Sequence, residues 1–337
     1  MTATNKPMRD RAATRRRFIA ISAAACGLPL LRMPARAAAP TLRVWRGAAL
    51  GADATLQINH PDAAAADRLI LACLAEVRRL EAVMSLYDPN SALARLNRHG
   101  VLEDPPFDLV RVLNESALFH ALTDGAFDVT VQPLWDLYAA HFSQTDPDPA
   151  GPKPEAVQSA LARVGQSSLE VSASRIRFLR RGMAATLNGI GQGYITDRVV
   201  ELLRAKGVDQ ALVDMGEMRA IGGHPAGGPW RVGLEVPRAR GEIAERIALF
   251  DCAVATSGGY GTEFDAAGRF NHIIDPASGG TSWRYGAVSV IGATATEADA
   301  LSVAFDLMPP ERIEPVVRSR ALQAHLAFAD GRRLIQG

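Results

Sequence analysis

The spacing of apolar residues divides the chain after residue 38 into strands and helices. Apolar residues at helical spacing predict amphipathic helices over 63–83 and 194–206. Uniformly apolar or alternating runs predict strands at 211–215 and 230–236. Because hairpins and helices both separate the strands, the pattern favours an α+β class, with a mixed sheet and helices packed on it, over a Rossmann fold.

The rest of the pattern predicts shorter elements. A strand pair is expected over 41–59 with Gly51 in its turn, and residues 142–154 are expected to form a surface loop. Asp108 is expected to cap a helix that ends at Gly125. Further predicted elements are a helix at 91–97, hairpins of 175–179 with 183–187 and of 262–265 with 270–274, strands at 247–256 and 286–291, and a helix at 296–308.

Residues 1–37 have the pattern of an export signal. The segment Thr14-Arg15-Arg16-Arg17-Phe18 contains a twin arginine, an apolar run follows, and Ala35-Arg36-Ala37 is a cleavage signal. We therefore expect a twin-arginine signal peptide at 1–37, a mature domain at 38–337 without a membrane span, and a periplasmic location. Two alternatives stay open, a basic tail and a lipid anchor at Cys26.

Charge changes the picture once the leader is set aside. The whole chain of 337 residues has a net charge of +1, but residues 1–37 hold eight Lys/Arg and one acid. The remainder has 29 basic and 35 acidic residues, about −6, which excludes the basic surface of a nucleic-acid-binding protein. Any phosphate must be bound locally, by a metal or by backbone N–H groups. Cys73 and Cys252 read as small buried hydrophobes, and a disulfide between them stays open.

The first candidate site is the glycine-rich segment Asn188-Gly189-Ile190-Gly191-Gln192-Gly193, between a strand and a helix. Backbone N–H groups in such a segment can approach a phosphate at a helix N-terminus. The spacing matches neither a dinucleotide-binding fingerprint nor a P-loop. A tight turn that needs positive φ explains the glycines equally well.

Three further candidates are single side chains. His272 lies on an expected strand, where a histidine is more often structural than a general base. Ser257 precedes two glycines at a strand end but is not in a G-x-S-x-G elbow, which argues against a serine hydrolase. Asp299, near a helix start, either complements the helix dipole or is a hard-oxygen ligand for Mg²⁺.

The order of these segments resembles the ApbE family, the FAD:protein FMN transferases, from about residue 41 to 325. The matching segments are short blocks in the family's order. They are 84–87 with Ser91 and Asn97; 125–130 with 133–134; 189–194 with Asp197; 213–217; 230–237; 255–258; 272–276 with Gly279; and 298–302.

The resemblance implies a mixed-sheet, T-fold-like α+β architecture with FAD in a cleft. It also implies Mg²⁺-dependent cleavage of the FAD diphosphate and transfer of FMN through a phosphoester to a Thr or Ser of another protein. On this basis His272 would be the base, and the metal would bind Gly189, Asp299 and Ser302. The FAD contacts would be Leu50, Tyr87, Gly125, Ala126, Phe127, Thr186, Gln192, Ser257 and Ile273.

Two positions depart from the family pattern, and they keep other functions open. Thr186 stands where the family usually has Asp, and Val303 stands where it usually has a Thr that supplies a metal oxygen. The alternatives are a non-catalytic periplasmic flavin-binding or flavin-donating protein and an FAD diphosphatase releasing FMN and AMP. The segment 186–190 and the leader resemble the branch associated with nitrous-oxide reductase maturation, whose partner is the FMN-accepting domain of a membrane-bound respiratory flavoprotein.

Overall fold

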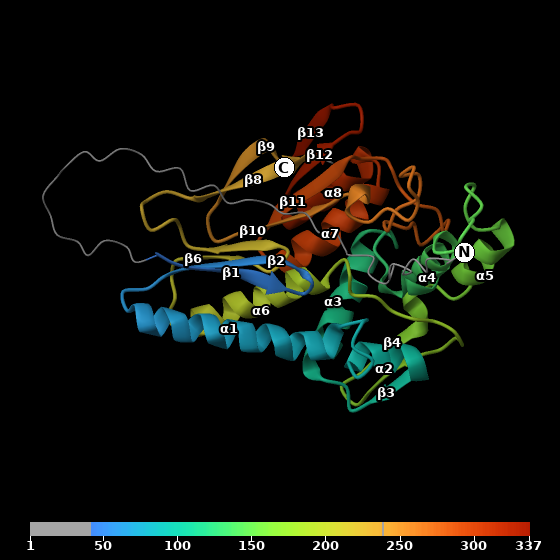
Figure 1. Ribbon diagram of the computed structural model, residues 1–337, viewed down its shortest axis with the longest axis horizontal. Helices are drawn as coiled ribbons and strands as arrows, with labels where there is room; N and C mark the ends of the chain where they lie inside the picture. The colour runs from blue at the N-terminus through green and yellow to red at the C-terminus, as the bar shows by residue number, and fades with distance from the viewer. Residues whose placement is uncertain (1–41, 238) are drawn as a thin grey trace, which may run out of the picture.

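The computed structural model describes residues 42–237 and 239–337 (Figure 1). The helices are α1 (Ala63–Met84), α2 (Ala92–His99), α3 (Phe107–Leu122), α4 (Gln132–Phe142), α5 (Pro154–Leu161), α6 (Gly191–Ala205), α7 (Ala295–Leu307) and α8 (Pro310–Arg320). The strands are β1 (Leu42–Ala49), β2 (Ala52–Asn59), β3 (Val101–Glu103), β4 (Leu169–Val171), β5 (Arg175–Phe178), β6 (Ala211–Asp214), β7 (Met218–Ile221), β8 (Trp230–Val236), β9 (Ala239–Leu249), β10 (Ala253–Ser257), β11 (Ala287–Gly292), β12 (Gln323–Ala327) and β13 (Arg333–Gln336). The expected α+β class is confirmed.

The central layer is an eight-stranded sheet in the order β1-β2-β6-β7-β10-β11-β12-β13. Every pairing of the described strands is antiparallel. Along β6, Ala211 and Val213 belong to the main core, while Leu212 belongs to a second core on the other face. A strand buried on both faces is apolar at every position, which explains the continuous run in the sequence.

Different layers cover the two faces of this sheet. Helices α1, α6 and α7 pack on one face through the main core, and α1 and α6 run side by side (Figure 1). The two-stranded ribbon β8–β9 packs on the other face, where Trp230, Val232 and Leu249 meet Leu212 and Val254. Helices α4 and α5 and the small sheet β3-β5-β4 lie at the far end of the molecule, beyond α3.

The predicted hairpin of 175–179 with 183–187 is wrong. Strand β5 pairs with β3 and β4 on its two sides, so no edge is left for the second segment. Residues 183–187 form no strand, because the side chain of Asn97 takes both the N–H and the C=O of Ala185, at 2.8 Å each. The segment is apolar because it is buried. The side chain of Asn97 makes the hydrogen bonds that a neighbouring strand would otherwise make with Ala185.

Two other strand predictions fail at turns. The predicted strand 247–256 breaks at Asp251, whose φ of 50° is left-handed, so that β9 and β10 belong to different sheets. The predicted hairpin around 266–268 contains only the isolated bridge between Glu263 and Asn271. Its aromatic residues pack against α4 instead of forming a ladder.

Asp108 is not the cap of α3. The N-cap position is Pro106, and Asp108 lies buried in the first turn. Its carboxylate accepts a hydrogen bond from the Tyr194 hydroxyl at 2.7 Å and pairs with Arg79 at 2.8 Å. The predicted role of Gly125 is closer to the structure: its φ is 84°, and its N–H donates to the carbonyl of His120, which closes the turn after α3.

Three predictions concern cysteines and membranes. Cys73 is buried and Cys252 half-buried, and both are free thiols; burial raises the pKa of Cys73 to about 12. None of the described helices combines the length and apolarity that a membrane crossing requires. The predicted leader, with its twin arginine and Cys26, lies outside the described residues.

Candidate active site

Helices α6 and α7 touch at their N-terminal ends. A Cβ on Gly193 would lie 2.3 Å from the Ala295 carbonyl oxygen and 2.8 Å from Cβ of Asp299. The N–H of Gly193 donates to Asp299 Oδ2 at 2.9 Å. Close helix packing therefore requires the last glycine of the glycine-rich segment, and the N-terminus of α6 fixes a carboxylate in place.

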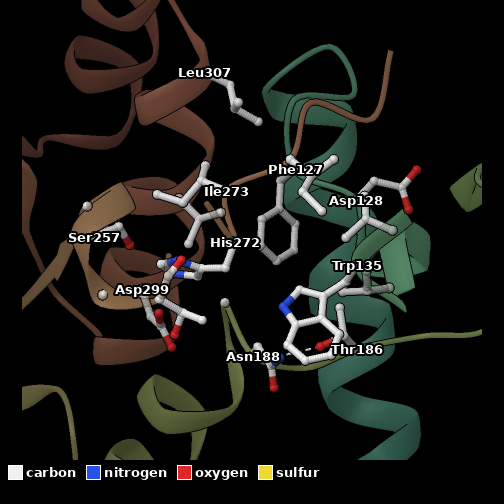
Figure 2. A pocket seen from close by; sticks show the side chains of 18 of the residues that line it. Phe127, Asp128, Trp135, Thr186, Asn188, Ser257, His272, Ile273, Asp299 and Leu307 are labelled. Carbon is white, nitrogen blue, oxygen red and sulfur yellow. Dashed lines mark hydrogen bonds between the residues drawn. The ribbon is translucent and has the colours of Figure 1, made fainter. Parts of the chain in front are cut away.

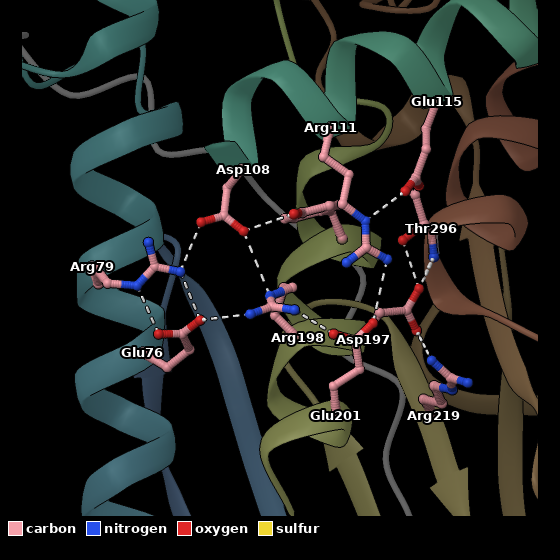
Figure 3. Close-up of polar contacts among 11 residues, drawn as sticks. Glu76, Arg79, Asp108, Arg111, Glu115, Asp197, Arg198, Glu201, Arg219 and Thr296 are labelled. Carbon is pink, nitrogen blue, oxygen red and sulfur yellow. Dashed lines mark hydrogen bonds and ion pairs between the residues drawn. The ribbon is translucent and has the colours of Figure 1, made fainter. Parts of the chain in front are cut away.

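One turn along α6, Asp197 caps α7 from outside (Figure 3). Its carboxylate accepts from the N–H groups of Ala295 and Thr296, at 2.9 Å each, and from the Thr296 hydroxyl at 2.6 Å. Arg219 from β7 completes the shell at 2.5 Å. These contacts fix the first turn of α7, and with it the position of Asp299 one turn later.

Ion pairs extend this anchoring to the neighbouring helices (Figure 3). Asp108 of α3 pairs with Arg79 of α1 at 2.8 Å and with Arg198 of α6 at 3.5 Å. Arg198 also reaches Glu76 of α1 at 3.7 Å, and the Tyr194 hydroxyl donates to Asp108. Helix α6 is thereby tied to α1 and α3 as well as to α7.

Three carboxyl groups gather near the start of α7. Burial raises the pKa of Asp299 to about 7, and burial with the charges of Asp299 and Asp214 raises the pKa of Glu217 well above its usual range. Burial likewise raises the pKa of Asp214 to about 7. In the described chain no ion pair reaches any of the three. A cation bound at one of them would offset the cost of burying its charge.

His272 lies on a segment without strands or α-helices, residues 258–286. Aromatic packing holds this segment against α4. Phe264 stacks on Tyr138 with ring centroids 5.7 Å apart and meets Trp135 edge-on at 5.6 Å, while Phe270 lies 5.7 Å from Tyr138. The predicted placement of His272 on a strand is therefore wrong, because side-chain packing shapes the segment.

Hydrogen bonds within the segment set the histidine ring. The buried Asn271 donates to the Ser282 carbonyl at 2.5 Å and accepts from the N–H of Ile273 at 2.8 Å. The ring Nδ1 of His272 lies 3.2 Å from the Thr262 carbonyl oxygen. Because a carbonyl only accepts, Nδ1 carries the proton of the neutral ring, and Nε2 is its basic nitrogen.

One pocket, which we name the central pocket, brings Asp299 and His272 together (Figure 2). Figure 2 shows the two side chains near each other on one side, with Phe127 and Trp135 facing them. The lining combines apolar side chains with glycines, hydroxyls and carboxylates. It consists of 126–129, Val131, Trp135, Thr186, Asn188, Gly189, Gln192, 216–217, 256–258, 261–262, 272–274, Pro276, Asp299, Val303 and Leu307.

Two neighbouring pockets meet the central pocket at Asn188, which lines all three. The α1 pocket is lined by 50–51, Arg78, 81–82, 84–88, 187–188, 191–192 and Ile195. The α2 pocket is lined by 86–87, Pro89, Ala94, 97–98, Gln132, 135–136, Ala184 and Asn188. The three pockets together form a branched cleft around the glycine-rich segment.

Comparison with known proteins shows the family to which the chain belongs. The model of the ApbE family matches residues 50–326. The chain belongs to the ApbE family. The FAD:protein FMN transferase of Klebsiella pneumoniae is 28% identical over 303 residues, covering 87% of this chain and 86% of the relative. That of Vibrio cholerae is 32% identical, covering 68% and 70%. The flavinyl transferase ApbE of Pseudomonas stutzeri has a similar structure, with a TM-score of 0.75, 27% identity and coverage of 88% and 95%.

The residues that the ApbE resemblance assigns to FAD lie mainly on two of the three pockets, and only Tyr87 also lines the α2 pocket. Leu50 and Tyr87 line the α1 pocket, and Gln192 lines both the α1 and the central pocket. The others line the central pocket: Ala126, Phe127, Thr186, Ser257 and Ile273. Gly125 does not line it, because its N–H closes the turn after α3, and it places Ala126 instead.

The side-chain amide of Gln192 has a hydrogen-bond donor that the described residues leave unused. Its side-chain Nε2 is buried, and no hydrogen-bond partner for it exists in the described chain. The neighbouring Gly216, with φ of 105°, leaves just enough room, since a Cβ there would lie 2.2 Å from Nε2. A buried donor that lines two pockets fits an oxygen of a bound nucleotide.

The candidate metal ligands lie close together but are not equivalent. Asp299 and Gly189 line the central pocket. Ser302 is fully buried behind it, where its hydroxyl lies 2.6 Å from that of Ser257 and donates to the Asp299 carbonyl at 2.9 Å. Val303 packs on Gly189, since a Cβ on the glycine would lie 3.0 Å from Val303 Cγ2.

The residues fit a hard cation that shares its ligands with a diphosphate. Within 42–237 and 239–337 no group of three or more His, Cys, Asp or Glu has metal-site geometry. Carbonyl, hydroxyl, water and phosphate oxygens must therefore complete any shell around Asp299, as Mg²⁺ usually requires. The buried carboxyl groups, which have no ion pairs in the described chain, would attract such a cation electrostatically.

Sequence reasoning missed Glu217 and Trp135 as site residues, whereas Asn188 belongs to the glycine-rich segment that the sequence did single out. Glu217 is 8% exposed and lines the central pocket, and its Oε2 accepts from the N–H of Thr256 at 3.3 Å. Its signal was present, because it ends the matching block 213–217. Trp135 gave no signal, since an aromatic residue on a helix usually belongs to the core.

Proposed function

We propose that this chain is a Mg²⁺-dependent FAD:protein FMN transferase. The observation that carries the proposal is the common lining of one pocket by Asp299 and His272, in a chain of the ApbE family whose relatives bear that name. Phosphoryl-group transfer depends on positioning and charge neutralisation more than on covalent chemistry from the protein. This cleft offers both.

In the proposed reaction, the hydroxyl oxygen of an acceptor Thr or Ser attacks the FMN phosphorus of FAD. The new P–O bond forms as the bond to the AMP oxygen breaks, so AMP leaves and FMN remains on the acceptor as a phosphoester. His272 Nε2 takes the hydroxyl proton, because Nδ1–H is held by the Thr262 carbonyl. When bound at Asp299, with Gly189 and Ser302 nearby, the cation would neutralise the diphosphate.

The flavin and its diphosphate have separate environments. Phe127, Ile273 and Trp135 provide apolar surface in the central pocket for a planar ring. Gln192 Nε2 offers its unused hydrogen bond where the central and α1 pockets meet. We therefore infer that FAD spans these two pockets, with its diphosphate near Gly189.

Acceptor labelling tests the function. The purified protein is incubated with FAD, Mg²⁺ and a recombinant FMN-binding domain whose attachment threonine is known, and flavin fluorescence is read in a denaturing gel. A fluorescent acceptor band with release of one AMP per band supports the transferase. Free FMN and AMP without a band would establish an FAD diphosphatase, and intact bound FAD would leave a flavin-binding protein.

We also propose a location, from the leader, and a partner, from the leader together with the segment 186–190. The twin-arginine pattern at residues 1–37 supports export to the periplasm, where the acceptor would be the FMN-accepting domain of a membrane-bound respiratory flavoprotein, as in nitrous-oxide reductase maturation. Fractionation of cells that express the full chain tests the location. Recovery of the protein in the cytoplasm with its leader uncut would contradict it.

A further inference from the structure

The α2 pocket is the one branch of the cleft that the assigned FAD contacts leave almost untouched. Tyr87, at its border with the α1 pocket, is the single assigned contact in its lining. Yet the α2 pocket opens to the reaction centre, because Trp135 and Asn188 line both it and the central pocket. A transferase must bind two substrates next to each other, and FAD accounts for two branches.

The α2 pocket is lined by side-chain oxygens that can accept hydrogen bonds. Gln132 is 7% exposed, and its Nε2 donates to Asp136 Oδ1 at 2.6 Å. That bond fixes the orientation of the amide, since a carboxylate only accepts. The Gln132 Oε1 is then left buried, with no hydrogen-bond partner in the described chain. Because Gln132 also lines the α2 pocket, this acceptor is available for a hydrogen bond from a ligand.

From these contacts we infer that the α2 pocket binds the polypeptide segment that carries the acceptor hydroxyl. The inference rests on the proposed transferase function. A segment in extended conformation presents backbone N–H groups. The Gln132 Oε1 and the Asp136 carboxylate can accept hydrogen bonds from these groups. A segment lying there directs its Thr or Ser past Trp135 and Asn188 toward Asp299 and His272.

Steric substitutions separate the two substrates. Ala94 of α2 lines the α2 pocket alone, and Ala82 of α1 lines the α1 pocket alone. With a recombinant FMN-binding domain as acceptor, Ala94→Trp should raise the KM for the acceptor about tenfold or more and leave the affinity for FAD, measured by quenching of flavin fluorescence, within about twofold. Ala82→Trp is the matched control, and it should weaken FAD binding instead.

A milder variant guards against misfolding. Gln132→Met keeps the side-chain volume and removes both the acceptor oxygen and the hydrogen bond to Asp136, so it should raise the KM for the acceptor about threefold to tenfold with an unchanged KM for FAD. A loss of FAD affinity in Ala94→Trp or Gln132→Met would show that FAD occupies the α2 pocket, and would overturn the inference. Unchanged acceptor kinetics in both variants would overturn it as well. If the wild type binds FAD but labels no acceptor, the transferase function fails, whereas the FAD titrations still test the pocket assignment.

Discussion

The two sides of the central pocket are built in opposite ways. Asp299 sits on regular helices, fixed by backbone hydrogen bonds, a buried ion pair at Asp197 and a glycine contact. His272 sits on the irregular segment 258–286, fixed mainly by aromatic packing on α4. The side of the pocket that carries Asp299, which we call the metal side, is therefore held in place by many polar contacts. The side that carries His272, which we call the base side, is held by a few side chains.

The difference matches the chemistry assigned to each side. A cation among buried carboxylates needs fixed ligands, because small displacements in a site of low dielectric change its energy strongly. A base that meets an incoming hydroxyl must allow a second protein to approach. We expect mutations on the metal side to change stability and metal affinity together, and mutations on the base side to change catalysis alone.

The largest effect is expected for Asp299→Asn. Loss of the carboxylate removes the charged ligand that would hold Mg²⁺, so labelling of an acceptor domain should fall at least about a thousandfold. The measurement is the initial rate of fluorescent band formation. Asp306→Asn is the matched control on the same helix, since Asp306 is buried but does not line the central pocket. Equal losses in both variants would contradict a specific role of Asp299.

His272→Ala should lower the labelling rate about a hundredfold or more, because general base catalysis contributes on that scale. FAD affinity, measured by fluorescence quenching, should stay within about twofold. The variant would thereby lose catalytic activity while it still binds FAD. His60→Ala, which changes a histidine that lines none of the three pockets, serves as the control. Full labelling by His272→Ala would remove this residue from the base role.

Asp197→Asn tests the anchoring of α7. It leaves Arg219 buried without its carboxylate, which should destabilise the fold by about 3 kcal/mol in urea unfolding. Because Asp197 fixes the first turn of α7, Mn²⁺ affinity, measured by electron paramagnetic resonance, should fall as well. Arg204→Ala, which breaks an exposed pair with Asp251, is the control and should change neither by much. If Asp197→Asn binds Mn²⁺ as tightly as the wild type, the anchoring of α7 by Asp197 contributes to stability but not to metal binding.

Asp306 gives a pH dependence that does not involve the site. Burial raises its pKa to about 7, from an ordinary value of 3.8. The folded protein therefore holds a proton that the unfolded chain has lost, and stability should fall as pH rises between about 4 and 7, by at most about 1.4 kcal/mol per unit. Above this window the contribution levels off. Urea unfolding of Asp306→Asn should show a shallower decline than the wild type, and identical profiles would refute the assignment.

The smallest effect is expected for Val303→Thr. The new hydroxyl would lie beside Gly189 and offer the oxygen that the family pattern usually has there, so Mg²⁺ affinity should rise about threefold to tenfold. Isothermal titration with Mg²⁺ measures it. Val303→Ala controls for the loss of packing, and it should bind Mg²⁺ no better than the wild type. A weaker site in Val303→Thr would mean that no cation approaches this position.

Sequence patterns predicted the metal side better than the base side. Helix α6 has helical apolar periodicity, and α7 and β6 are largely apolar, so all three were found within a few residues. Residues 262–274 were misread as a hairpin, because alternation of Phe264 and Phe270 with polar residues cannot distinguish a strand from a loop packed on a helix. Short strands such as β7 and β12 were missed, since so few residues carry little periodicity.

The chemistry was predictable only where it followed family blocks. His272, Asp299 and Gln192 lie in such blocks, and the structure places all three in one cleft. Gln132 and Trp135 could not be recognised from the sequence, because their role depends on an orphaned amide oxygen and on a border between pockets. Those are tertiary properties.

The contact at Gly193 has a consequence for turnover. A methyl group there would overlap the Ala295 carbonyl, so the N-termini of α6 and α7 are packed backbone against backbone. We therefore expect these two helix ends to move as one unit while AMP is released.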